Sequence, residues 1–138
     1  MIDCEFELFT ILAEKLRAEF PGIYVTGEYI WAPARFPCVS IEERDNVVWR
    51  NSRDSLTYEN HAAVMYEINV YSNKSVGKKA ECKAIIAVAD EEMRRLGFSR
   101  TMLSSVQNLS DATIYRMTSR YSGIVADDGD NNYTIYKR

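Results

Sequence analysis

Basic charge, histidine, cysteine and long apolar runs are all scarce in this sequence of 138 residues. Lys and Arg number 17 against 20 Asp and Glu, so the net charge is −3 and the pI is near 5.2. Sequence-specific DNA binding is disfavoured, because nucleic-acid binders usually carry a basic stripe. No apolar run is long enough to span a membrane, and the acidic segment Met1–Glu7 is unlike a signal peptide. We therefore expect a protein that is neither secreted nor membrane-spanning.

Cysteine and histidine usage leaves little room for metal or nucleophile chemistry. Cys4, Cys38 and Cys82 are an odd number at wide spacings, which suits neither a disulfide framework nor a zinc site. We interpret them as reduced core residues, with free reactive thiols as the alternative. His61 is the only histidine, so every Ser-His, Cys-His or multi-histidine site would depend on it. Its polar neighbours favour a surface or turn position.

Three motifs that could carry chemistry fail on inspection. Gly77-Lys78 lacks both the earlier glycine and the following Ser or Thr of a phosphate-binding loop. The acidic run Asp127–Asn132 has no glycine at the position that an EF-hand loop requires, so a hairpin turn is the better interpretation. The three acids Asp90–Glu92 are consecutive on a predicted helix and point in different directions, which indicates a solvated face. We expect no enzyme activity, cofactor or metal.

What the sequence does contain is the composition of one globular domain over residues 1–138. Hydrophobic residues make up 46% and charged residues 27%, close to the globular average. A chain of this length buries roughly 68% of the surface that its unfolded form exposes, which is enough for one core. We find no repeat, low-complexity tract or linker.

Two amphipathic helices are predicted from apolar residues at helical spacing. The first spans Ile2–Phe20, with Asp3 as a candidate N-cap. The second runs from Asn73–Ser75 to Leu96 and ends at Gly97, a residue suited to the left-handed position after a helix. The predicted apolar stripes consist of Phe9, Leu12, Ala13, Leu16 and Phe20, and of Cys82, Ile86, Ala89, Met93 and Leu96.

Strands are predicted from alternation and from β-branched and aromatic residues. They cover Ile23–Trp31, Val39–Glu43, Val64–Tyr71, Phe98–Val106, Ala112–Val125 and Tyr133–Lys137. In the third, Tyr66 and its alternate neighbours lie on one face and Glu67 and Asn69 on the other, and we expect both faces to be partly covered. The order of elements indicates an α+β fold, in which two main helices pack on a mainly antiparallel sheet.

Residues Arg44–Ala62 form the least core-like segment, and we expect a protruding loop or hairpin there. The segment is polar but carries aromatic and Arg residues of the kinds that anchor protein interfaces. The candidate interface residues are Trp49, Arg50, Arg53, Leu56 and Tyr58. A loop with no partner is the alternative.

The pattern of the whole chain resembles the phage tail terminator, or tail completion, family of tailed phages and prophages. The segments that carry the resemblance are Phe20–Gly22, Phe36–Val39, Glu59–His61, Val64–Lys74 and Gly77–Phe98. The resemblance implies a structural virion protein, assembled in the host cytoplasm, that forms a hexameric ring on the head-proximal end of the tail tube. Such a ring ends tube polymerisation and provides the docking surface for the head-tail connector, and DNA passes through its lumen without specific binding.

Two rival interpretations remain open from the sequence. Another head-tail connector or stopper protein would share the size, the charge and the absence of catalytic motifs. A small ligand-binding or enzymatic domain could instead use a pocket lined by Tyr66, Tyr115 or Tyr121, although aromatic residues at strand spacing are usually core residues.

Overall fold

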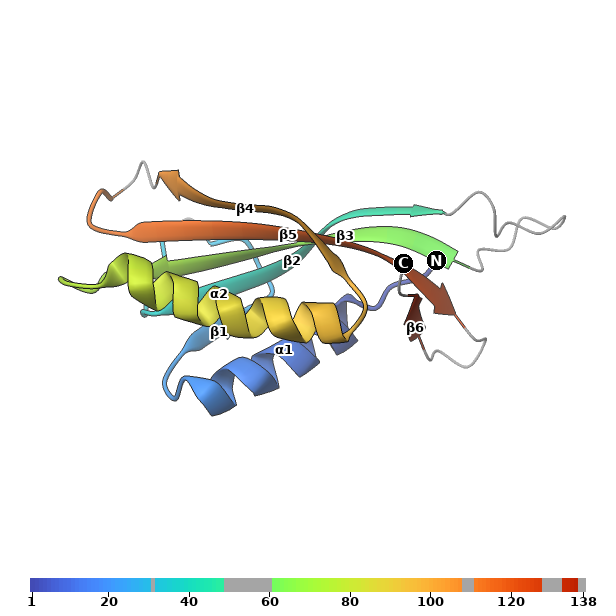
Figure 1. Ribbon diagram of the computed structural model, residues 1–138, viewed down its shortest axis with the longest axis horizontal. Helices are drawn as coiled ribbons and strands as arrows, with labels where there is room; N and C mark the ends of the chain where they lie inside the picture. The colour runs from blue at the N-terminus through green and yellow to red at the C-terminus, as the bar shows by residue number, and fades with distance from the viewer. Residues whose placement is uncertain (31, 49–60, 108–110, 128–132, 137–138) are drawn as a thin grey trace, which may run out of the picture.

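The computed structural model describes residues 1–30, 32–48, 61–107, 111–127 and 133–136. Two helices lie on one face of a six-stranded sheet, so the predicted α+β class is confirmed (Figure 1). In chain order the elements are α1 (Glu5–Glu19), β1 (Tyr24–Thr26), β2 (Cys38–Val48), β3 (His61–Ser72), α2 (Lys78–Arg95), β4 (Ser99–Gln107), β5 (Tyr115–Asp127) and β6 (Tyr133–Tyr136).

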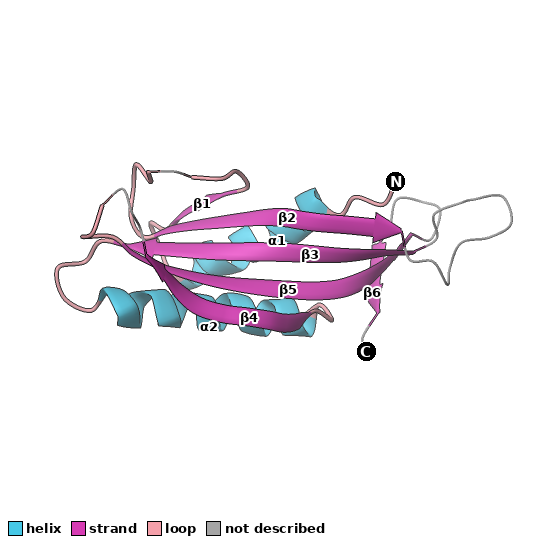
Figure 2. Cartoon of the chain, turned by 90° about the horizontal axis from the view of Figure 1, so that it is seen from above, coloured by secondary structure: helices cyan, strands magenta, loops and turns pink. Residues whose placement is uncertain are grey.

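The sheet has the strand order β1-β2-β3-β5-β4, and β6 pairs with the C-terminal end of β5. All pairings are antiparallel except that of β1 with β2, which is parallel. Figure 2 looks onto the face that carries no helix, with α1 and α2 behind the strands. The sheet therefore has one helix-covered face and one uncovered face.

The core lies between the helices and the covered face. The prediction for α2 is confirmed for Cys82, Ile86, Ala89 and Met93, which are buried together with Ile85, whereas the fifth predicted member, Leu96, is the C-cap and is only partly buried. In α1 the buried stripe consists of Leu8, Leu12, Ala13 and Leu16. The predicted members Phe9 and Phe20 are only partly buried beside it. The sheet contributes the predicted alternate residues of β3, Val64, Tyr66, Ile68 and Val70.

The first predicted strand is too long. In the structure, β1 ends at Thr26. There the Thr26 hydroxyl accepts the amide N–H of Glu28 at 3.3 Å, and the chain turns away from the sheet. Alternation would place Tyr29 on the same face as Ile23 and Val25, but those two are buried and Tyr29 is 51% exposed. Alternation alone suggested strand here, whereas pairing with β2 stops at Ser40.

The second predicted strand is too short, because β2 continues to Val48. A β-bulge between Glu43 and Asp45 breaks the alternation, and this explains why the sequence pattern does not read as strand beyond Glu43. Pairing with β3 resumes after the bulge and reaches Val48 opposite Ala62. The part of the predicted loop at residues 49–60 lies outside the described residues.

The N-terminal segment is anchored under the end of β2 by polar contacts. The Tyr66 hydroxyl donates to Oε1 of Glu43 at 3.1 Å and lies 3.2 Å from Sγ of Cys4. Nδ2 of Asn46 donates to the carbonyl of Ile2 at 2.7 Å. Burial raises the pKa of Glu43, and the hydrogen bond from Tyr66 only partly opposes this effect. These contacts fix the start of α1 against the sheet.

The α1 cap differs in detail from the prediction. Cys4 occupies the N-cap position, and Asp3, the residue before it, accepts the amide N–H of Glu5 at 3.2 Å. All three cysteines are free and buried, as the sequence predicted. Burial raises the pKa values of Cys38 and Cys82 to about 12, so both thiols are protonated at neutral pH.

Candidate functional site

The five interface residues predicted from the sequence, Trp49, Arg50, Arg53, Leu56 and Tyr58, lie outside the described residues. The strands on either side are described: β2 and β3 are antiparallel neighbours that pair up to Val48 and Ala62. The segment therefore connects adjacent strands, as a hairpin connection does. Its role as an interface stays a prediction.

The uncovered face of the sheet carries a cluster of polar side chains across its three central strands. The register places Glu42 of β2, Glu67 of β3 and Arg120 of β5 in one row. The next row consists of Ser40, Asn69 and Thr118. Although no helix covers this face, Glu67 is only 4% exposed and Asn69 only 1% exposed. The side chains of the cluster cover one another.

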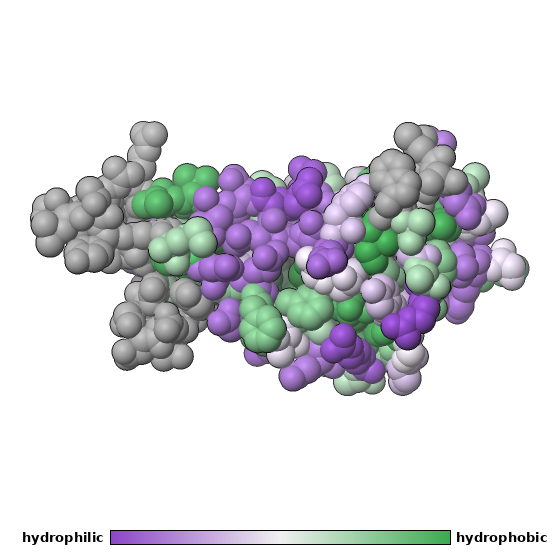
Figure 3. All heavy atoms as spheres, turned by 180° about the vertical axis from the view of Figure 1, so that it is seen from behind, coloured by the Kyte–Doolittle hydropathy of each residue, from purple (hydrophilic) through white to green (hydrophobic). Residues whose placement is uncertain are grey.

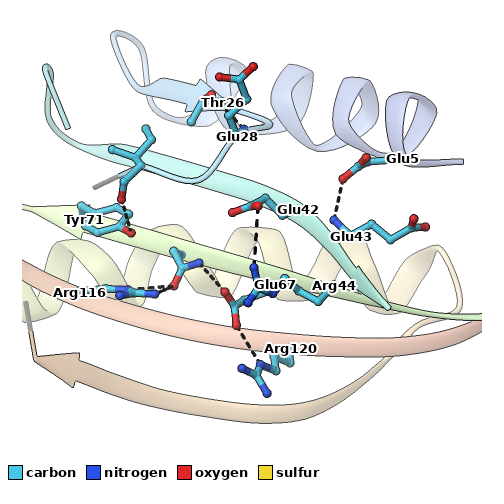
Figure 4. A network of polar contacts seen from close by, with 12 residues as sticks. Glu5, Thr26, Glu28, Glu42, Glu43, Arg44, Glu67, Tyr71, Arg116 and Arg120 are labelled. Carbon is cyan, nitrogen blue, oxygen red and sulfur yellow. Dashed lines mark hydrogen bonds and ion pairs between the residues drawn. The ribbon is translucent and has the colours of Figure 1, made fainter. Parts of the chain in front are cut away.

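Hydrogen bonds join the β3 and β5 members of this cluster and Arg116 of β5 into one network (Figure 4). Nε of Arg120 donates to Oε1 of Glu67 at 2.9 Å, and Nδ2 of Asn69 donates to Oε2 of the same carboxylate at 3.0 Å. Oδ1 of Asn69 accepts from Nε of Arg116 at 3.0 Å and from the Thr118 hydroxyl at 2.6 Å. Both guanidinium groups are thus bound within the face.

The network keeps Glu67 ionised. Burial raises the pKa of this carboxyl group, but the hydrogen bonds from Asn69 and Arg120 outweigh burial and hold the pKa below its usual value. A carboxylate with two strong donors is a poor proton acceptor, so this arrangement is suited to a stable polar surface and not to acid–base chemistry.

The β2 side of the same face is more acidic. Glu42 approaches Arg44 at 4.0 Å, and its Oε1 is buried without a hydrogen-bond partner in the described structure, as is the hydroxyl of Ser40. Burial raises the pKa of Glu42, and Arg44 opposes this only in part. The acidic charge of the uncovered face is therefore weighted toward β2, and the arginines toward β5.

A shallow groove of about 340 Å³ lies at the end of the uncovered face near the β2 bulge. Apolar side chains of three strands line it, among them Val47, Met65 and Ile124, and Asp45 adds one carboxylate. A second bulge, between Arg100 and Met102 of β4, lies beside the groove, so the sheet bends here. Gly123 also lines the groove. On the other face of the sheet, the Phe98 ring occupies the space that a side chain at position 123 would need.

The residues considered for chemistry are dispersed. His61 begins β3 and is partly buried, so it lies on a strand and not in the predicted turn. In α2 the predicted solvated face is wrong for two of the three acids. Glu92 is buried and bound by Arg95, and Asp90 accepts from Arg100 and from the Tyr121 hydroxyl. Sequence spacing could not reveal the partners of Asp90, because Arg100 and Tyr121 reach it from β4 and β5.

Within the described ranges, no group of three His, Cys, Asp or Glu side chains is placed to hold a metal ion. Among the same residues, no helix is long and apolar enough to cross a membrane. A scan of the sequence against protein-family models found no match. A search of curated proteins also found no match.

Proposed function

We propose that this chain is a structural virion protein that works by assembly and not by catalysis. As a hexameric ring it caps the head-proximal end of a phage tail tube, ends tube polymerisation and provides the surface on which the head-tail connector docks. Its partners are further copies of itself, the tail tube protein and the connector protein. Assembly takes place in the host cytoplasm, and the finished ring is part of the virion tail.

The observation that carries the proposal is the uncovered polar face of the sheet. A ring around a DNA channel needs a wall that stays in water and does not hold phosphate groups. Arg116 and Arg120 are engaged by Asn69 and Glu67, so their guanidinium groups have partners within the face. Phosphate binding by proteins depends on basic groups that replace the counterions of DNA. The Glu67 carboxylate balances the charge of Arg120, whereas Asn69 is neutral and only orients Arg116; the carboxylates of Glu42 and Glu67 in the same row oppose phosphate, which supports passage of DNA without retention.

The test is deletion of the gene from the phage or prophage that encodes it, followed by negative-stain electron microscopy of the induced lysate. We expect full heads beside detached tails, with tubes of irregular length. Complementation with the wild-type gene should restore tails of uniform length, which separates the loss of this protein from effects on neighbouring genes. Normal infectious particles in the deletion lysate would overturn the proposal.

The same experiment separates the connector or stopper alternative. A connector acts after the tail is complete, so its loss leaves tubes of the correct length that fail to join heads. Tube length is therefore the decisive measurement, and attachment alone is not. Tubes of uniform length in the deletion lysate would assign the chain to the connector class.

A further inference from the structure

The two edges of the sheet both offer backbone groups for further pairing. At one edge, the part of the chain that the structure describes pairs β4 with β5 alone. At the other, β1 covers β2 only from Cys38 to Ser40, so Ile41–Val48 has no outer strand partner among the described residues. Figure 2 shows β2 and β4 on opposite sides of the sheet, with the short β1 beside only part of β2. Unpaired edges of this length are usually protected or used.

We infer that β4 of one copy adds to the outer edge of β2, along Ile41–Val48, of the next copy in the ring. This inference rests on the proposed ring and identifies the contact between its copies. β2 and β5 run in one direction and β3 and β4 in the other. A neighbour in the same orientation therefore brings β4 antiparallel to β2, and the two segments are comparable in length. The contact is head-to-tail, which is the kind that closes a ring.

Charge favours this pairing over the pairing of two identical edges. β2 carries Glu42, Glu43 and Asp45 against the single Arg44. The other edge strand, β4, instead carries no acidic residue and one arginine, Arg100, which forms an ion pair with Asp90 of its own copy. Two β2 edges would place acid opposite acid, whereas β4 against β2 brings no further acidic residue to the β2 edge.

Apolar side chains match on the helix side of the same two edges. Leu103 of β4 pairs with Ser119, whose neighbour on β3 is Ile68, so Leu103 lies on the covered face, yet it is 45% exposed. Phe6 follows Glu5, whose carboxylate contacts the β2 edge, in the first turn of α1 and is 77% exposed. A strand added to β2 would place its helix-side residues over this turn. Figure 3 shows hydrophobic areas set within a largely hydrophilic surface on the back of the molecule.

Addition of the strand requires one local exchange. The carboxylate of Glu5 accepts the amide N–H of Glu43 at 2.7 Å and so occupies the edge of β2 in the single copy. A carbonyl of the incoming strand can take its place when the Glu5 side chain turns away. Ile2 and Cys4 are 1% and 4% exposed and can stay in the core during this exchange. Glu5 therefore protects the edge until a neighbour arrives.

The test is cross-linking of the double variant Phe6→Cys/Leu103→Cys with a short bis-maleimide reagent. The three native cysteines are buried, so the two new thiols are the reactive ones. We expect a ladder of covalent species in multiples of 15.9 kDa that stops at the closed ring. The matched control Phe6→Cys/Val76→Cys should give no ladder, because Val76 is 86% exposed but lies in the loop before α2, away from both edges. Light scattering of the untreated protein gives the mass of the assembly.

Three outcomes would overturn the inference. Cross-linked dimers of Leu103→Cys alone would show that two β4 strands pair with each other. A closed oligomer in which the double variant does not cross-link would place the contact elsewhere and leave the proposed ring standing. A single-chain mass at every concentration would exclude pairing between free copies. Tube length in the deletion lysate tests the capping function separately from all three.

Discussion

At the scale of single residues, Glu67 offers the clearest test of the polar face. Replacing it with Gln removes the negative charge that binds Arg120 and Asn69, and should cost about 1–3 kcal/mol of unfolding free energy at pH 7. The matched control is Glu91→Gln, an exposed acid on α2, which should change stability by less than about 0.5 kcal/mol. Urea unfolding of both variants and the wild type measures the difference.

The same carboxyl group makes this difference depend on pH. The pKa of Glu67 is lower in the folded state than the value of about 4.3 expected for an unfolded Glu. Its contribution is therefore fully present above that value and is lost as pH falls through the folded pKa. The stability gap between wild type and Glu67→Gln should be largest near neutral pH and shrink in acid. Glu42 and Glu43 have raised pKa values and also make the stability depend on pH. Comparing the variant with the wild type at each pH separates the effect of Glu67 from theirs. A stability gap that does not change with pH would contradict a lowered pKa for Glu67.

Gly123 is a second residue whose role can be tested directly. A Cβ atom at this position would lie 2.5 Å from Cδ1 of the Phe98 ring, which is closer than real Cβ contacts. Gly123→Ala should therefore destabilise the protein by about 1–3 kcal/mol through overpacking. Gly27→Ala is the control, because its Cβ would meet the Phe9 ring at an ordinary 3.6 Å. Equal thermal stability of the two variants would show that Phe98 moves aside freely.

At the scale of elements, the position of α1 depends on the hydroxyl of Tyr66. Tyr66→Phe removes the donor to Glu43 and the contact with Cys4, leaving a partly buried carboxylate with fewer partners. We expect a loss of about 1–3 kcal/mol and faster amide exchange in the first turn of α1. Tyr121→Phe is the matched control, because the Tyr121 hydroxyl donates to Asp90 of α2. If both variants speed exchange in α1 equally, the Tyr66 hydroxyl does not fix this helix.

The elements also show which parts of the fold could be predicted from sequence. The α2 stripe was correct because Cys82, Ile86, Ala89 and Met93 follow the helical period whatever lies beyond the helix. The parallel pairing of β1 with β2 could not be predicted, since the partner of an edge strand is chosen by tertiary packing. The bulge after Glu43 breaks the alternation of side chains along β2. The second half of this strand could not be predicted for that reason.

The candidate site was less predictable than the fold. Alternation in β3 placed Glu67 and Asn69 opposite the core residues, and this is confirmed. Their partners Arg116 and Arg120 are distant in sequence, and only the register of β3 with β5 brings them together. A sequence pattern specifies the face on which a side chain lies, whereas its neighbour across the sheet depends on strand order.

At the scale of the whole molecule, the proposed channel requires that the ring release DNA, and Glu67 makes this testable. In the wild type the charge of Arg120 is balanced by Glu67. The assembled protein should therefore not retain double-stranded DNA at physiological salt. Glu67→Gln leaves that charge unbalanced in every copy, so the variant ring should bind DNA. The slope of log K against log salt should be about −0.9 for each phosphate group that the variant ring neutralises.

Filter binding over a salt series measures this effect, with Glu91→Gln as the control. That substitution changes the net charge equally but acts on α2, on the helix side of the sheet, so it should leave DNA binding unchanged. Equally increased binding by both variants would mean that net charge alone sets retention. Strong salt-dependent binding by the wild type would contradict a polar face with internally paired arginines, because basic groups on the assembly would then be free to hold phosphate.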